Sequence, residues 1–143
     1  MKTILFFLLL LMTASTMGYS QCDKNIIITS SRTEYLDAKD SIQHTALENT
    51  TIEISKAAIT IAPGDDVNRV MNGKISSMEC QWKIPFSEGR TVIKAVFVNR
   101  VGDTKNATLT IEGKDGRIVF LLAAAENPEF RIKVLADKFE EKK

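Results

Sequence analysis

Apolar and polar residues alternate along most of the chain after residue 25, and this pattern is the clearest structural signal in the sequence. In Thr51-Ile52-Glu53-Ile54-Ser55 the isoleucines fall on one face and the polar residues on the other, and Ile59-Thr60-Ile61 repeats the pattern. Because successive side chains of a strand point to opposite faces, this period of two predicts half-buried β-strands. About eight strands are predicted, at 26–29 (with 33–36 as a candidate continuation), 51–55, 59–61, 74–84, 91–99, 106–112, 117–125 and 130–134.

Glycine, proline and asparagine separate these segments at the spacing of short turns. Expected turns lie at Pro63-Gly64, Asn72-Gly73, Gly102-Asp103 and 113–116, while no window shows a sustained helical stripe. The fold class is therefore predicted as all-β, an antiparallel meander. Such a meander fits an up-and-down barrel or an immunoglobulin-like β-sandwich. The barrel is favoured, because closure removes edge strands that invite aggregation.

Two predicted strands break the alternation, because residues 92–98 and 118–125 are apolar on both faces. An antiparallel strand with one wet face should not have this composition. Protein could cover both faces, a partner could cover one of them, or one face could line a lumen that holds an apolar ligand. On the third interpretation the lining candidates are the large apolar residues Met78, Trp82, Phe97, Phe120 and Leu122. For Trp82 the favoured interpretation is a core anchor, and a ligand-facing indole is the alternative.

The N-terminal segment has the pattern of a cleavable export signal. Lys2 precedes an apolar run from Ile4 to Met12, which is too short to span a bilayer, and small and polar residues follow. Gly18 and Ser20 place small side chains at −3 and −1 for a cut before Gln21. The sequence thus predicts a signal peptide at 1–20 and a single β domain at 21–143 with a short charged, solvated tail at 138–143. The expected location is the periplasm or the extracellular space.

The two cysteines left after this cut are Cys22 and Cys80. In an oxidising compartment they are candidates for a disulfide. The alternative is that Cys80 is a small buried apolar residue and Cys22 a free thiol near the new N-terminus. A lipid anchor on Cys22 is less favoured, because that processing wants a small residue immediately before the cysteine and Gln21 stands there.

Charge and motif content exclude several classes of function. The chain carries 19 basic and 18 acidic residues, and removal of residues 1–20 takes away one lysine and brings the formal charge to zero. A neutral domain with interspersed charges has no field that would attract nucleic acid. No phosphate-binding glycine loop, nucleophile elbow or zinc motif occurs, and His44 is the only histidine. We therefore expect no enzymatic activity, no cofactor, no metal and no transmembrane segment in the mature domain.

Three segments resemble the lipocalin-like exported proteins of bacteria: 51–55, Ile59-Thr60-Ile61-Ala62-Pro63-Gly64, and the late hairpin from Leu109 to Gly116. The resemblance is one of architecture and extends over roughly residues 26–138. It implies a small barrel and an exported binding protein that holds a small apolar ligand inside it. Two alternatives remain open: a β-sandwich that binds a protein partner in the periplasm or at the cell surface, and a structural protein.

Overall fold

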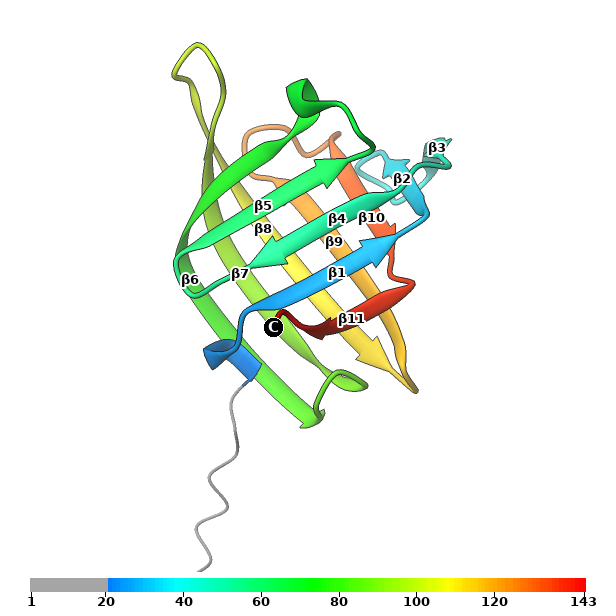
Figure 1. The fold of residues 1–143 in the computed structure, drawn as a ribbon. Coiled ribbons are helices and arrows are strands. Elements are labelled where there is room, and N and C mark those ends of the chain that lie inside the picture. The colour runs from blue at the N-terminus through cyan, green and yellow to red at the C-terminus, as the bar shows by residue number, and fades with distance from the viewer. Residues whose placement is uncertain (1–20) are drawn as a thin grey trace, which may run out of the picture.

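The computed structural model describes residues 21–143, and these form one antiparallel sheet of eleven strands (Figure 1). The all-β prediction is confirmed, whereas the expected signal peptide at 1–20 lies outside the described residues. Two short 3-10 turns, η1 (Gln21–Asp23) and η2 (Val67–Arg69), are the only helical segments within residues 21–143. The strands are β1 (Ile26–Ser30), β2 (Arg32–Leu36), β3 (Ile42–Ala46), β4 (Thr50–Ile54), β5 (Ala58–Pro63), β6 (Met71–Ile84), β7 (Glu88–Val98), β8 (Thr104–Lys114), β9 (Arg117–Ala124), β10 (Arg131–Leu135) and β11 (Lys138–Glu141).

The strand order is β11-β1-β4-β5-β6-β7-β8-β9-β10-β2-β3, in which β4 to β10 form the predicted meander. The sheet curves so that β1, β4 and β5 pass across β7, β8 and β9 (Figure 1). Pairing ends at β11 on one side and β3 on the other. The predicted closed barrel is therefore not confirmed, and neither is the division into two sheets that an immunoglobulin-like sandwich requires.

Three of the eleven strands were not predicted as separate strands. β2 continues β1 after Ser31, and β3 follows a tight turn in which the Asp37 carboxylate accepts hydrogen bonds from the backbone N–H groups of Lys39 and Ser41. Residues 138–143, predicted to be a solvated tail, instead contain β11, which pairs along β1. Phe139 is its one inward side chain, and it packs against the core.

Asn72-Gly73, a predicted turn, lies inside β6. The chain turns earlier, at η2, where the Asp66 carboxylate caps the backbone N–H of Asn68. Gly73 stands opposite Phe97 of β7, and a Cβ atom added to it would lie 2.8 Å from the Phe97 ring and 2.9 Å from Ile59. The glycine thus permits close packing in this position and does not form a turn.

The core lies between the two crossing layers of the curved sheet. Its side chains are the inward members of the alternating strands, which is the arrangement that the period of two predicts. The largest fully buried residues come from both layers: Ile28, Ile52, Ile59, Ile93, Leu109, Ile111, Phe120 and Val134.

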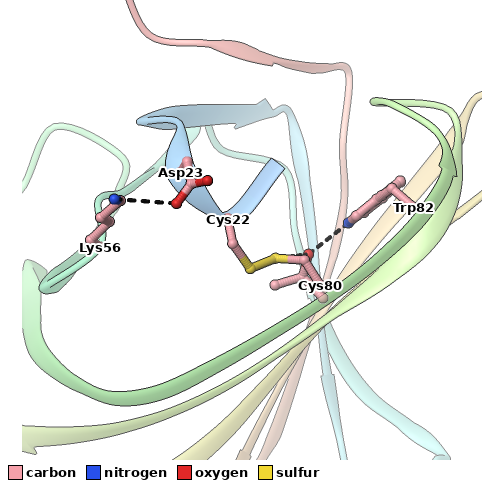
Figure 2. The surroundings of a disulfide bond; sticks show 6 residues. Cys22, Asp23, Lys56, Cys80 and Trp82 are labelled. Carbon is pink, nitrogen blue, oxygen red and sulfur yellow. Dashed lines mark hydrogen bonds and ion pairs between the residues drawn. A yellow bond between two sulfur atoms is a disulfide. The ribbon is translucent and has the colours of Figure 1, made fainter. Parts of the chain in front are cut away.

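A disulfide joins Cys22 of η1 to Cys80 of β6, with 5.8 Å between their Cα atoms (Figure 2). Beside it, Trp82 Nε1 donates a hydrogen bond of 2.7 Å to Thr91 Oγ1. An ion pair of 3.2 Å between Lys56 and Asp23 holds η1 to the turn between β4 and β5 (Figure 2). The disulfide occupies the Cys22 sulfur, which is the atom that a lipid anchor would need.

Candidate functional site

The five residues proposed as ligand-lining all face or border the interior, but they do not form one site. Phe120 and Leu122 are buried, whereas Met78, Trp82 and Phe97 are half-buried and pack against the core. The Trp82 ring contacts Phe139, with 5.6 Å between centroids, while Phe97 borders a separate recess formed by residues of η2, β6, β7 and β8.

The interior cavity beside Phe120 and Leu122 has a volume of about 30 Å³. Pockets for drug-sized ligands have volumes of roughly 300–1,000 Å³. This cavity is therefore too small for such a ligand, and Phe120 and Leu122 pack within the core beside it.

The second apolar face of β9 lies on the outside of the sheet. Val119 and Leu121 line an outer groove of about 330 Å³, together with Leu36 and Ile42 of the hairpin formed by β2 and β3. The charges around this groove are largely paired. Arg90 lies 3.4 Å from Glu112, and the buried Glu34 carboxylate lies 3.1 Å from Arg32 and 3.8 Å from Lys133.

A different arrangement occurs where five connections gather at one end of the sheet (Figure 1). We call this the loop end and define it as residues 37–41, 47–49, 64–70, 99–103 and 125–130. Residues 21–143 have seven large apolar side chains that are exposed, and among these only Ile84 lies away from the loop end. The other six lie within the loop end or directly beside it: Ile42 (54% exposed), Leu47 (82%), Val67 (78%), Val98 (58%), Val101 (80%) and Phe130 (40%).

Polar contacts connect these loops to one another and to the strands beside them. Arg69 of η2 holds Glu48 in a two-pronged ion pair, with N–O distances of 2.6 and 2.7 Å. Two further contacts are a 2.5 Å hydrogen bond from Arg100 to the Asn68 side chain and an ion pair between Asp40 and Arg131. The Glu126 carboxylate accepts a 3.0 Å hydrogen bond from the backbone N–H of Asn106. The first two contacts cross from loop to loop, so they link the segments 47–49, 64–70 and 99–103, which carry Leu47, Val67 and Val101.

These contacts lower the pKa of two carboxyl groups in the loop end. The hydrogen bond from Arg69 holds the pKa of the Glu48 carboxyl below its ordinary value. The hydrogen bond from the Asn106 backbone does the same for the pKa of Glu126. A lowered folded-state pKa means that each contact stabilises the loops above the carboxyl's ordinary range and is lost as the pH falls through the lowered value.

The loop end is also the acidic end of an otherwise neutral domain. Its five segments contain eight acidic and three basic residues, although residues 21–143 have equal numbers of both. Apolar tips within an acidic surround can contact a surface that is apolar and basic. Sequence reasoning missed this site, because Leu47, Val67, Val101 and Phe130 each stand alone in a polar connection, while Ile42 and Val98 lie in strands. The available signal was that several connections each contained one large apolar residue.

Comparison with known proteins adds no assignment: no family model, curated protein or solved structure matches the chain. Within residues 21–143 no helix is long and apolar enough to cross a membrane. The same residues contain no cluster of three or more histidine, cysteine, aspartate or glutamate side chains that could hold a metal ion.

Proposed function

We propose that this chain is an exported, non-enzymatic interaction module that docks a partner protein on its loop end. The observation that carries the proposal is that six of the seven exposed large apolar side chains within residues 21–143 lie in the loop end or directly beside it. Single exposed apolar residues are normal on a protein surface, but a concentration of them marks a binding surface. The cross-loop contacts of Arg69 and Arg100 support this, because a surface that is already ordered loses less entropy on binding.

The acidic surround determines the kind of partner that fits. A basic surface would gain from the excess of acidic residues at the loop end. An anionic membrane would be repelled by the same residues, since polybasic and not acidic segments bind such membranes. The partner surface is therefore apolar with a basic rim.

The interior cavity and the outer groove are less suited to a binding function. A ligand inside the core would need a larger space than the cavity of about 30 Å³ beside Phe120. The outer groove is larger, but Arg90, Glu112 and Glu34 already have charged neighbours of their own, so it offers little unpaired charge for a partner.

The disulfide supports the cellular location in this proposal. Disulfides persist in oxidising compartments and are rare in the cytosol. Together with the predicted signal peptide, the Cys22–Cys80 bridge agrees with a protein that acts in the periplasm or outside the cell.

The proposal is testable with a defined mimic of the partner. A short amphipathic peptide of leucine and lysine is expected to bind the protein, whereas the same pattern of leucine and glutamate is not. Replacing two tips (Val67→Ser with Val101→Ser) should weaken the binding by about tenfold, because two small apolar contacts are lost. The matched control is Ile84→Ser, which removes the exposed apolar side chain that lies outside the loop end.

Binding is measured by isothermal titration calorimetry at low and high salt, and circular dichroism checks that each variant is folded. Equal binding of both peptides, or an equal loss in Ile84→Ser and the double variant, would contradict the proposal. Tighter binding to phosphatidylglycerol vesicles than to the leucine–lysine peptide would point to a membrane instead.

A further inference from the structure

A recess of about 290 Å³ opens beside η2 and between β6, β7 and β8. Its volume is near the lower limit for pockets that hold small molecules. The lining combines apolar, amide and cationic side chains: Asn68, Arg69, Val70, Met71, Asn72, Phe97, Val98, Asn99, Arg100 and Lys105.

The apolar part of the recess includes Phe97, which is half-buried and lies opposite Gly73. Met71 is likewise half-buried against the core, and Val98 is 58% exposed. These three side chains can cover one face of an aromatic or aliphatic group. The amides of Asn68, Asn72 and Asn99 add polar atoms to the lining.

The charge in the recess is of one sign, because no carboxylate lines it. Arg69 is neutralised by Glu48, whereas Arg100 and Lys105 make no ion pair of 4.0 Å or less within residues 21–143. Lys105 does interact electrostatically with the Glu126 carboxylate at longer range, so Arg100 is the less compensated of the two cations. Arg100 instead donates a hydrogen bond to the neutral side chain of Asn68. Two cations beside an apolar wall are suited to an anion that carries an apolar body.

Three acidic residues of the connections beside the recess already accept hydrogen bonds from the protein. Asp66 accepts a 2.9 Å hydrogen bond from the backbone of Asn68, and Asp103 accepts one of 3.4 Å from the Asn99 side chain. Glu126 accepts from the backbone of Asn106. The remaining acidity of the loop end still disfavours a multiply charged anion such as a phosphate ester, so a single negative charge is the better match.

We propose that this recess binds a carboxylate attached to an aromatic or aliphatic group. The carboxylate lies between Arg100 and Lys105, and the apolar group rests on Phe97 and Met71. A free small acid and the C-terminal residue of a peptide both have this chemistry. The inference does not rest on partner docking, since Met71, Phe97 and Lys105, which line the recess, lie outside the loop end; Val98 borders both.

The experiment is a titration followed by ¹H–¹⁵N NMR, with phenylacetate and phenylacetamide as a matched pair of probes. Phenylacetate should shift the backbone signals of residues 70–72 and 97–105, and phenylacetamide should bind about tenfold more weakly because it lacks the charge. Neutralising both cations (Arg100→Gln with Lys105→Gln) should weaken phenylacetate binding by a similar factor. Lys39→Gln, which removes a loop-end cation outside the recess, should leave it unchanged.

Equal binding of the acid and the amide, or shifts confined to other residues, would overturn the proposal. So would unchanged phenylacetate binding in the variant that lacks both cations. A peptide that ends in Ala-Ala-Phe with a free carboxylate separates the two sources: tighter binding than phenylacetate identifies a chain terminus, and weaker binding identifies a small acid. The Val67→Ser, Val101→Ser variant separates the two proposals. If it no longer binds the leucine–lysine peptide but still binds phenylacetate, the two sites are independent.

Discussion

Gly73 faces Phe97 across the boundary between β6 and β7, and the aromatic ring occupies the space in which a side chain would otherwise lie. The dipeptide Asn72-Gly73 is typical of an exposed hairpin turn, which is why the sequence predicts a turn there. Nothing in the local sequence shows that a ring from β7, more than twenty positions further along the chain, needs this glycine. Close approach between distant residues is therefore the part of the fold that local patterns do not contain.

Replacing Gly73 with alanine tests this packing. The new Cβ atom would lie within 2.9 Å of the Phe97 ring and Ile59, so we expect a loss of about 1–3 kcal/mol from overpacking. Urea unfolding monitored by circular dichroism should show a lower midpoint with an unchanged slope. Combining Gly73→Ala with Phe97→Leu should recover part of the loss, and a double variant whose losses simply add would show that the ring is not the cause.

At the scale of single elements, β11 shows how a strand can escape prediction. Three of its four residues are charged, so the segment has the composition of a solvated end. The remaining residue, Phe139, packs against Trp82 and against Phe86, with centroid distances of 5.6 and 5.0 Å. One inward aromatic residue and a row of backbone hydrogen bonds to β1 are sufficient for a strand at the edge of a sheet.

Truncating Phe139 should weaken the pairing of β11 with β1 at the edge of the sheet. Phe139→Ala is expected to cost about 2 kcal/mol, below the range for a fully buried phenylalanine, because the side chain is only half-buried. Trp82 loses a ring neighbour, so its fluorescence should shift to longer wavelength, and the amides of β1 should exchange faster with deuterium. Glu140→Ala, which changes an exposed neighbour on the same strand, should stay within about 0.5 kcal/mol of the parent. Equal effects of the two substitutions would rule out the packing role.

The loop end shows the same contrast between local and distant information. The turns themselves follow from the sequence, because residues such as Pro63-Gly64 and Gly102 interrupt the alternating segments. Their convergence at one end depends on strand pairing, and the Arg69–Glu48 link joins positions 21 residues apart. The exposed apolar tips could be read individually from the sequence, but their common position could not.

At the scale of the whole molecule, the alternation of apolar and polar residues was sufficient to predict the fold class. It was not sufficient to predict whether the sheet closes into a barrel. A period of two specifies which face of each strand is buried, but it does not specify which distant strand becomes its neighbour. The pairs β1 with β11 and β2 with β10 join segments about a hundred residues apart. Whether the sheet closes or remains open depends on those pairs.

The disulfide is the covalent counterpart of these long-range pairs, since it joins residues 58 positions apart. In the chain-entropy model, a loop of this size stabilises the folded state by about 4 kcal/mol. Cys22→Ser with Cys80→Ser should therefore lower the free energy of unfolding by an amount of that order. Urea unfolding of the oxidised parent, the reduced parent and the double variant checks this, and the last two should agree. If the free energy of unfolding falls by much less than about 1 kcal/mol, η1 is held in place by its other contacts, such as the ion pair between Asp23 and Lys56.

The antiparallel pairing of β1 with β11 places Ile26 opposite Glu141, so the two ends of the described chain lie beside each other, away from the loop end (Figure 1). This geometry determines how the molecule can be displayed. A tag attached after residue 143 and held on a sensor chip would leave the apolar tips pointing into solution. The same adjacency makes the domain suited to circular permutation, with a short linker joining its ends and new termini opened in a distant turn.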